Sequence, residues 1–414
     1  MKIVFFTDFY FPDLNGVSAA VELSAQGLRD LGHRVYIVAP AAAKPTPNDH
    51  PDVIRLPSTP GVWYKEMRDG IMTPKYATKI KALDADIYHI HTNGVTGLSA
   101  MRLMFSLDMP AVAHYHTDYE EYSKIYRGMW AGILTASLFG PLFVGQQKAW
   151  PESLQGIRPK KSFKEWNDNM VRNLIRLSYI YFGQIIVPSQ KMKDKLISYG
   201  VNRPIAVLPT GLNPEEFQIL EQPSKQGGFS LLYIGRVSKE KNIDVLIDAA
   251  KILAHKGIDF HLKIVGPGPY YLTKVKQRVK NEGLEKFVSL TGGLPREKAL
   301  AQYLQADAFL FPSMTDTQAL VLNEAAYAGL PLVYSDPEIS QIAKDGETGI
   351  IAKPTGTSYA DAIEFLMANP QKAKECGEKG NSLASKLTID NQAKALEKLY
   401  KNTIKQHTPY ENSF

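Results

Sequence analysis

AFLFPSMTDTQALVLNEAAYAGLPLVYS, residues 308–335, places a helix-forming segment between two short apolar runs. The runs AFLF and PLVY have the length and composition of buried strands. The segment between them, from about Gln318 onward, has the small and apolar residues of a helix. A helix that joins two buried strands is the repeating unit of a parallel sheet. This stretch therefore predicts an α/β fold with a mostly parallel sheet.

The same alternation of strands and helices extends outward from this stretch. It starts at Phe229 with SLLYIG and continues through a helix from Asn242 to His255. An earlier round starts at the N-terminus, with strands predicted at Lys2–Phe6, Arg34–Ala39, Val53–Leu56, Ile87–His91 and Ala111–Tyr115. Two rounds of alternation predict two Rossmann-like, doubly wound domains.

The length of the chain, 414 residues, also exceeds what one hydrophobic core usually supports. We expect an N-terminal domain at residues 1–205, a C-terminal domain at residues 206–390, and a last helix at residues 391–414 that returns to the N-terminal domain. Residues 204–228, rich in Pro, Gly and Gln, suit a hinge linker. Residues 122–182 break the alternation and are interpreted as an insertion.

Positive charge is concentrated around the insertion. The net charge is only +6, but residues 124–203 hold 13 Lys and Arg against 4 Asp and Glu, a local charge of +9. Such a zone favours an anionic partner, which could be phospholipid, an acidic polysaccharide or nucleic acid. No RNA-binding or helix-turn-helix signature accompanies it, so we expect no nucleic acid. The single cysteine, Cys376, forms no internal disulfide, and the short apolar start does not suggest secretion.

Two carboxylates in the opening stretch suggest a nucleotide-sugar site. Asp316 precedes the predicted helix and Glu324 lies about two turns inside it, so both can face the mouth of a cleft. Carboxylates accept hydrogen bonds from sugar and ribose hydroxyls, and the helix N-terminus offers N–H groups to a diphosphate. The simpler interpretation is that Asp316 caps the helix and Glu324 is a solvated helical residue.

Two cations follow another predicted strand, in GRVSKEKN. Arg236 and Lys241 stand beyond its carboxyl end, where doubly wound sheets bind ligands. They would neutralise a diphosphate leaving group, although an ordinary charged loop has the same composition. In the first loop of the chain, Gly16 leads into a helix and would let the backbone approach a phosphate. A simple turn accounts for Gly16 equally well.

Together these pieces resemble glycosyltransferase family 4, the retaining enzymes with the GT-B fold, along nearly the whole chain. The matching motifs run in family order: FPDLNGVS, HIHT, HYHTDYEEY, IIVPSQ, LPTGLN, IGRVSKEKN, IVGPGP and PSMTDTQALVLNEAAYAGLP. The resemblance implies two domains that face a cleft, and a metal-independent transfer of a hexose with retention of configuration.

The resemblance also implies roles for residues of the C-terminal half. Glu324 would hold the ribose hydroxyls and Asp316 the hexose hydroxyls, while Arg236 and Lys241 would hold the diphosphate. The family usually has Glu in place of Asp316 and Gly in place of Ala319, which leaves the donor hexose open.

In the N-terminal half, the resemblance implies that Gly16 approaches the phosphates and His116 lies near the reacting carbon. The expected catalytic set is His116, Arg236, Lys241 and Asp316. Further donor contacts are expected at Gly266, Thr317, Gln318, Ala319 and Leu320.

Four histidines form two H-x-H pairs on neighbouring predicted strands, His89 with His91 and His114 with His116. Each pair lies on one face of the sheet, and four imidazoles could bind zinc. We favour packing within the sheet for His89 and His114, and a place at the cleft for His91 and His116. Asp84-Ala85-Asp86 imitates a metal-binding DxD, but it precedes a strand and is interpreted as a turn. We expect no catalytic metal and no cofactor.

HTDYEEY opens the insertion, and together with TDTQ it looks most like bacterial 1,2-diacylglycerol 3-alpha-glucosyltransferases (monoglucosyldiacylglycerol synthases). Asp118, Glu120 and Glu121 are the candidates for acceptor contacts. Residues 128–147 are uncharged and contain Gly and Pro, so we expect them to lie on a membrane rather than cross it. The expected contacts with an anionic membrane surface are Lys124, Arg127, Trp130, Phe139, Phe143, Lys148, Lys160, Lys161, Lys164 and Trp166. The alternative is a buried helical lid with a solvated basic rim.

We therefore expect an enzyme at the cytoplasmic face of the membrane that transfers glucose from UDP-glucose to a lipid, diacylglycerol. One alternative is a family 4 enzyme that acts on a polysaccharide, teichoic acid or protein-linked acceptor. Another is a non-catalytic sugar-nucleotide or lipid-binding protein of the same fold. Since no side chain is placed as a nucleophile, we favour front-face displacement, in which the departing phosphate accepts the acceptor's proton.

Overall fold

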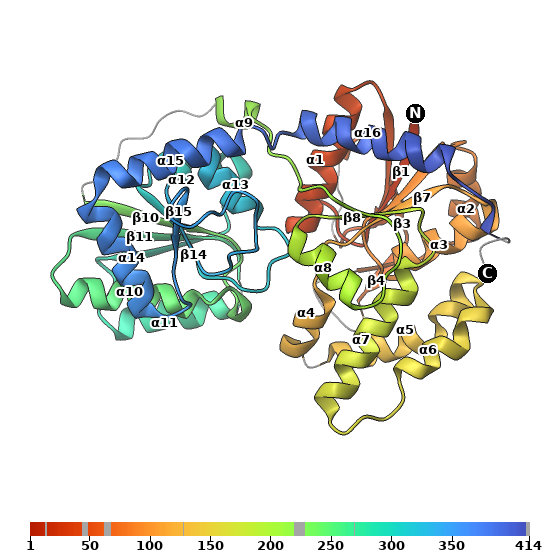
Figure 1. Cartoon of the computed structure of the whole chain (residues 1–414), viewed down its shortest axis with the longest axis horizontal. Helices are drawn as coiled ribbons and strands as arrows, with labels where there is room; N and C mark the ends of the chain where they lie inside the picture. The colour runs from red at the N-terminus through yellow and green to blue at the C-terminus, as the bar shows by residue number, and fades with distance from the viewer. Residues whose placement is uncertain are drawn as a thin grey trace. The chain divides into compact units, whose positions relative to one another are not determined.

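The computed structural model describes residues 1–12, 15–43, 49–61, 68–126, 128–218, 228–268 and 270–410. The chain divides into two compact units, each drawn in Figure 1. Unit 1 comprises Met1–Gly211 together with Ile389–Phe414, and unit 2 comprises Leu212–Thr388. The chain therefore leaves unit 1 once and returns to it with its last helix.

Unit 1 is built on a parallel sheet of seven strands in the order β3-β2-β1-β6-β7-β8-β9. Its strands are β1 (Lys2–Phe6), β2 (Arg34–Pro40), β3 (Val53–Leu56), β6 (Ile87–Ile90), β7 (Ala111–His114), β8 (Gln184–Val187) and β9 (Ile205–Val207). A separate antiparallel pair joins β4 (Ser58–Pro60) to β5 (Arg68–Gly70). The central strands are buried on both faces, which explains why the sequence shows continuous apolar runs rather than alternation.

The helices of unit 1 are α1 (Gly16–Asp30), α2 (Pro74–Lys81), α3 (Val95–Leu107), α4 (Tyr119–Ile125), α5 (Met129–Val144), α6 (Trp150–Gly156), α7 (Phe163–Tyr179), α8 (Gln190–Ser198) and α16 (Ile389–Lys405), with a 3-10 turn η1 (Gln147–Ala149). Helix α16 packs against α1. Gly27 permits this approach, because a Cβ there would lie 2.7 Å from the carbonyl oxygen of Ile389. In the same contact, Gln392 donates to the hydroxyl of Ser24 at 3.1 Å.

Helices α4 to α7 fill the interval between β7 and β8. They lie together beside the sheet of unit 1, in gold to yellow-green in Figure 1. A single crossover helix would suffice to join two parallel strands, so these four helices are more than the sheet requires. They form the part of unit 1 in which the basic residues were found in the sequence.

Unit 2 is built on a parallel sheet of six strands in the order β12-β11-β10-β13-β14-β15. Its strands are β10 (Phe229–Ile234), β11 (Phe260–Val265), β12 (Val288–Gly292), β13 (Ala308–Phe311), β14 (Leu332–Tyr334) and β15 (Gly349–Ile351). Its helices are α9 (Glu215–Gln218), α10 (Ile243–His255), α11 (Tyr271–Asn281), α12 (Arg296–Tyr303), α13 (Leu320–Tyr327), α14 (Gly356–Ala368) and α15 (Pro370–Ala384), with a 3-10 turn η2 (Lys239–Lys241). The opening stretch of the sequence is β13, α13 and β14, and its two strands pair in parallel as predicted.

The predicted hinge linker at residues 204–228 is not a simple linker. Its first part is β9, whose backbone pairs in parallel with β8 at the edge of the unit 1 sheet. The β-branched residues of this short run favour a strand over the coil that its Pro and Gly neighbours suggested. Helix α9 follows in unit 2, and residues 219–227 lie outside the described residues. The border between the units falls after Gly211.

Candidate active site

Loops that follow β10, β11 and β13 gather at the carboxyl edge of the unit 2 sheet, where parallel sheets bind ligands. Gly235 follows β10 and Gly266 follows β11. A Cβ on Gly266 would lie 1.7 Å from the carbonyl oxygen of Gly235, so only glycine lets these two loops touch. The φ of Gly266, +151°, is also one that other residues rarely adopt. Arg236 comes directly after this contact.

Lys241 and Asp316 meet at this edge of the sheet. Lys241, in the turn η2, is only 7% exposed, and its Nζ donates to Oδ1 of Asp316 at 2.5 Å. The other carboxylate oxygen of Asp316 is buried and has no hydrogen-bond partner among the described residues. Arg236 belongs to the same neighbourhood, since its Nη2 lies 3.4 Å from Oε1 of Glu240, next to Lys241. The structure thus brings Arg236, Lys241 and Asp316 together.

Glu324 lies in a different set of contacts, and two of its partners were missed in the sequence. It is 5% exposed and accepts a hydrogen bond from the Tyr303 hydroxyl at 2.8 Å and from Nη1 of Arg296 at 2.5 Å. Arg296 also reaches Glu216, at 2.9 Å. Burial alone would lower the pKa of Arg296, but the charges of Glu324 and Glu216 outweigh it and raise that pKa. Arg236 was predicted because it follows the carboxyl end of a strand. Arg296 follows the carboxyl end of β12, so the same rule would have indicated it too.

Helix α13 begins at Leu320, so Glu324 lies about one turn inside it and not two. Asp316 does not cap this helix, since the N-cap position is Ala319 and makes no side-chain cap hydrogen bond. Glu324 is buried rather than solvated, so both parts of the simpler interpretation are wrong. Thr317 and Gln318 lie half-buried in the loop before the helix.

Two buried polar residues in this region were not predicted. Ser313 is fully buried and its hydroxyl has no partner among the described residues. Asn323 is 1% exposed; its side-chain oxygen accepts from Ser340, but its Nδ2 has no described partner. Unpartnered buried polar atoms are rare in folded proteins, so these two residues are further candidates for ligand contacts.

In unit 1, Gly16 opens helix α1 in an exposed position. The side chain of Asn15 accepts from the backbone N–H of Val17 at 2.9 Å and of Ser18 at 3.0 Å, which forms the helix cap. A Cβ on Gly16 would meet no atom within 4 Å. The absence of a side chain at Gly16 is therefore not needed for packing within unit 1, and the phosphate contact expected there stays a prediction.

Four histidines, on and just after β6 and β7, stack against one another; we call them the histidine array: His89, His91, His114 and His116. The ring centroids are 3.9 Å apart for His89 and His91 and 3.8 Å apart for His114 and His116. Burial lowers the pKa of each of these four residues below 6.5, and that of His116 to about 3. The array is therefore neutral at physiological pH.

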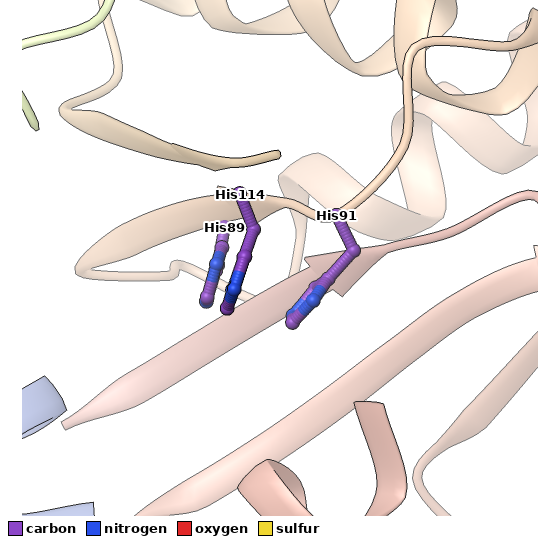
Figure 2. Close-up of side chains that lie close together, drawn as sticks. All are labelled: His89, His91 and His114. Carbon is purple, nitrogen blue, oxygen red and sulfur yellow. The ribbon is translucent and has the colours of Figure 1, made fainter. Parts of the chain in front are cut away.

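Figure 2 shows three members of the array, His89, His91 and His114, with their rings side by side and pointing in the same direction. One ring nitrogen from each of the three lies within 4.8 Å of the other two. The planes of the His89 and His114 rings differ by only 3°, and those of His91 and His114 by 22°. Imidazole lone pairs lie in the ring plane, so stacked parallel rings do not aim them at one point, as tetrahedral zinc requires.

Asp118 and Glu120 are buried in what we call the carboxylate network, together with Lys195, Arg172 and Tyr199. Lys195 donates to both oxygens of Asp118, at 2.8 and 2.6 Å. Arg172 donates to Glu120 at 2.7 Å, and the Tyr199 hydroxyl donates to its other oxygen. Burial would raise the pKa of Glu120, but hydrogen bonds from Arg172 and Tyr199 and the charge of Lys195 outweigh it and lower that pKa to about 2.

Glu121 is half-buried and pairs with Lys124 at 2.6 Å. The carboxylates expected to contact the acceptor thus already hold helix α4 to its surroundings. Cations of the basic zone are used in such pairs: Arg172 binds Glu120 within the network, and Arg176 binds Glu152, outside it, at 2.6 Å. Part of the local charge counted in the sequence is therefore neutralised within unit 1.

Aromatic side chains are exposed on helices α5 to α7. Trp130 and Phe163 are 37% and 63% exposed, and both rings contact Trp166, at 6.1 and 5.6 Å between centroids. Phe139 and Phe143, further along α5, are exposed as well. The lysines predicted to accompany them, Lys148, Lys160, Lys161 and Lys164, are exposed. Arg127 lies outside the described residues.

The aromatic and basic side chains of α5 to α7 thus share the surface of one helical region. Over the part of the chain that the structure describes, no helix combines the length and apolar character needed to cross a bilayer. A surface of exposed rings and lysines suits contact with an anionic interface.

Comparisons with known proteins cover the chain from end to end. Residues 14–216 match the family model described as Glycosyltransferase Family 4, and residues 215–383 match the model described as Glycosyl transferases group 1. The alpha-monoglucosyldiacylglycerol synthase of Streptococcus pneumoniae is 26% identical over 98% of this chain and 86% of its own length. The enzyme of that name from Acholeplasma laidlawii is 25% identical over 98% of both chains.

Among solved structures, the HepE protein of Anabaena in complex with UDP and glucose matches with a TM-score of 0.67. The match has 16% identity and covers 97% of this chain and 99% of HepE. At this identity the likeness shows the fold alone, and it confirms the prediction of two Rossmann-like domains.

Proposed function

We propose, since the chain belongs to the family 4 glycosyltransferases of GT-B fold, that it transfers glucose from UDP-glucose to diacylglycerol with retention of the anomeric configuration. The choice of diacylglycerol as acceptor rests on the similarity to two alpha-monoglucosyldiacylglycerol synthases. This similarity extends over almost the whole chain. The enzyme class rests on both family models.

The donor is assigned to the carboxyl edge of the unit 2 sheet. Arg236 and Lys241 are the cations for the diphosphate, and Asp316 and Glu324 are the carboxylates for the hexose and ribose hydroxyls. The contact between Lys241 and Asp316 supports this assignment, because Nζ of the cation proposed for the phosphate lies 2.5 Å from Oδ1 of the carboxylate proposed for the adjacent sugar. Binding of UDP and glucose by HepE, which has the same fold, supports UDP-glucose as the donor.

In the proposed reaction, the acceptor hydroxyl attacks the anomeric carbon on the face from which UDP departs. The bond from that carbon to the phosphate oxygen breaks, the bond to the acceptor oxygen forms, and the hydroxyl proton passes to the departing phosphate. Lys241 and Arg236 stabilise the negative charge that develops on the phosphate, which is the step that such cations accelerate most. The reaction balances without a metal or a redox partner.

The lipid acceptor is assigned to unit 1, whose helices α5 to α7 bear the exposed aromatics and lysines. Rings of this kind insert at the acyl boundary, while lysines contact anionic headgroups for about 1 kcal/mol each. The protein would therefore work while bound to the cytoplasmic membrane surface, where diacylglycerol resides.

The assignment of the donor is tested by transfer of radiolabelled glucose from UDP-glucose to diacylglycerol in vesicles, with chelator present. Lys241→Ala should lower kcat by about 100-fold or more, as loss of a group that stabilises transition-state charge does. The matched control is Lys239→Ala, in the same turn η2 but with an exposed side chain, which should keep normal activity. Equal activity of Lys241→Ala and wild type would refute the phosphate role.

The assignment of the membrane surface is tested by flotation with vesicles that contain anionic lipid. Replacement of Lys160, Lys161 and Lys164 by Ala should weaken binding by roughly 100-fold, since three cations contribute about 3 kcal/mol. A control of equal charge replaces three exposed lysines of α16, Lys394, Lys398 and Lys401. An equal loss of vesicle binding in both triple variants would show that only net charge matters. Transfer of glucose to a soluble polymer without vesicles would favour a different acceptor.

A further inference from the structure

Helix α12 of unit 2 directs two hydrogen-bond donors at one carboxylate. Arg296 is the first residue of this helix and Tyr303 is its last, about two turns later, so both side chains leave the same face. The helix packs against α13, where Nη1 of Arg296 lies 2.5 Å from Oε1 of Glu324. The Tyr303 hydroxyl lies 2.8 Å from Oε2 of the same residue. Each oxygen of Glu324 is thus held by a different donor.

Arg296 is itself oriented by a second carboxylate. Glu216, on α9, pairs with the edge of the guanidinium that Nε and Nη2 form: its two oxygens lie 2.9 Å from Nη2 and 3.3 Å from Nε. A planar guanidinium that is bidentate to one carboxylate has a fixed orientation. Its remaining nitrogen, Nη1, is left for Glu324.

The Tyr303 side chain is fixed by packing. It is 1% exposed and contacts the rings of Phe217 on α9 and Phe309 on β13, with 6.4 and 5.6 Å between ring centroids. Burial and the charge of Glu324 raise the pKa of the Tyr303 hydroxyl well above its ordinary value. The hydroxyl therefore keeps its proton and donates it to the carboxylate.

The two protein donors leave part of the Glu324 carboxylate unused. A carboxylate oxygen accepts about two hydrogen bonds, and each oxygen of Glu324 accepts one from the described residues. One further acceptor position therefore remains on each oxygen. Two such positions on one planar carboxylate match a pair of neighbouring donors, as they do in bidentate pairing with arginine. The two adjacent hydroxyls of a ribose are such a pair.

We propose that Arg296 and Tyr303 are positioning residues for Glu324: they fix its two oxygens so that the carboxylate accepts both hydroxyls of a ribose cis-diol. The site then selects ribonucleotides over 2′-deoxyribonucleotides, because a nucleotide without the 2′-hydroxyl leaves a buried carboxylate oxygen without its second donor. This inference rests on the proposed role of Glu324 in binding the ribose. It adds the residues that hold Glu324 in place.

The test is isothermal titration calorimetry of the full chain with UDP and with 2′-deoxy-UDP, which needs neither acceptor nor vesicles. Wild type should bind UDP about 10- to 100-fold more tightly than the deoxy analogue, the difference expected for one hydrogen bond to a charged group. Glu324→Ala should bind the two nucleotides equally. Arg296→Ala should also lose most of the preference for UDP, because the carboxylate is no longer oriented.

Two milder variants keep the test decisive even where Arg296→Ala does not fold. Glu216→Gln weakens the pairing that orients Arg296 but leaves Glu324 its cation, and Tyr303→Phe removes the donor to Oε2 of Glu324. Each should lower the preference for UDP by about 2- to 10-fold, as loss of one ordinary hydrogen bond does. Urea unfolding confirms that each variant is folded before titration.

Each variant has a matched control in unit 2. Arg278 pairs with three carboxylates, none of them Glu324, so Arg278→Ala should lose stability but keep the preference for UDP. Glu215→Gln removes an exposed carboxylate from the same helix, α9. Tyr334→Phe removes a buried hydroxyl that has no partner among the described residues. Both should bind UDP and 2′-deoxy-UDP as wild type does.

The outcomes separate this inference from the donor assignment. No binding of UDP, equal binding of UDP and 2′-deoxy-UDP by wild type, or an intact preference in Glu324→Ala would refute the ribose role of Glu324, and this inference with it. Loss of the preference in Glu324→Ala, but not in Arg296→Ala, Glu216→Gln or Tyr303→Phe, would overturn the positioning role alone. An equal loss of affinity for both nucleotides in Arg296→Ala counts the same way, because the arginine would then act through its charge on the phosphates.

Discussion

Two buried polar clusters of unit 1 follow each other along the same stretch of chain, but one consists of neutral groups and the other of ion pairs. The histidine array excludes charge: its rings face one another, the hydroxyl of Tyr400 and the ring of Phe5. The carboxylate network, which begins two residues after His116, retains charge by pairing each carboxylate with a cation. The carboxylates Asp118 and Glu120 are buried, as His89 and His91 are, so burial alone does not determine whether a group is charged.

The difference lies in the partners. Desolvation acts on both clusters, and it lowers the pKa of the histidines because burial disfavours the charged ring and the neighbouring imidazoles bring no negative charge. The same desolvation would raise the pKa of Glu120, but its hydrogen bonds from Arg172 and Tyr199 reverse the direction. A buried group thus keeps its charge only where an opposite charge or donor is built beside it. The two clusters should therefore respond to different perturbations.

The largest expected effect is acid destabilisation of unit 1 through the histidine array. The folded pKa of each buried histidine lies below the ordinary 6.5, so the folded state binds fewer protons than the unfolded state. Their contribution is present above about pH 6.5 and is lost as pH falls below it. At pH 5 each histidine lowers the free energy of unfolding by about 2 kcal/mol, and the three most buried histidines together lower it by up to about 6 kcal/mol. Urea unfolding followed by tryptophan fluorescence measures this for unit 1, because all four tryptophans lie in residues 1–211.

His114→Leu separates the array from other titrating groups. Neither ring nitrogen of His114 has a partner among the described residues, so the variant should cost little at pH 8 and should reduce the loss at pH 5 by about 2 kcal/mol. The carboxylate network does not interfere, because the low pKa of Glu120, about 2, means that its contribution is lost only below about pH 4.5. An unchanged pH dependence in His114→Leu would mean that His114 is already protonated in the folded state.

A smaller but still large effect is expected when the carboxylate network loses one partner. Lys195→Met leaves Asp118, 1% exposed, without the cation that contacts both of its oxygens. Breaking a buried pair in this way costs about 3 kcal/mol. Tryptophan fluorescence in urea at pH 7.5 reports the loss. In the double variant with Asp118→Asn, where no charge is stranded, most of the stability should return; no recovery would mean that the lysine acts through packing.

Most of the fold was predictable from the sequence because buried parallel strands and their helices have a clear pattern. Strands β1 and β3 have the predicted bounds, and α10 begins and ends within one residue of its predicted bounds. One strand that was not predicted is β9, a run of three residues among Pro and Gly, which is too short to be distinguished from coil. It is a strand because its backbone pairs with β8 at the edge of the sheet, and that pairing cannot be predicted from the local sequence.

The candidate site was predictable only where one local rule applies. Residues after the carboxyl ends of strands can be read from the sequence, and this rule indicates Arg236, Lys241 and Asp316. It would also have indicated Arg296. The partner of a buried charge cannot be found in this way: Lys195 is 77 residues from Asp118, and Arg172 is 52 residues from Glu120.

The histidines show the same limit. The H-x-H spacing indicates that each pair shares a face of the sheet, but not that the rings stack in parallel. Nor does it indicate that Tyr400, 311 residues from His89, supplies a hydroxyl from the last helix. Packing between distant segments decides both, so the sequence alone could not separate the zinc hypothesis from the packing hypothesis.

The smallest expected effect comes from Tyr400→Phe, which removes the hydroxyl bonded to Nδ1 of His89. It should cost about 1 kcal/mol, since one hydrogen bond is lost. Tyr115→Phe is the matched control, because Tyr115 is equally buried but its hydroxyl has no partner among the described residues, so its removal should cost almost nothing. Unfolding of both variants between pH 5 and 8 sharpens the comparison of the two clusters: His89 is neutral in the folded state with or without Tyr400, so Tyr400→Phe should lower stability equally at every pH. A loss that grows as pH falls would mean that the hydroxyl had been stabilising a charged His89, and that the array holds charge as the carboxylate network does.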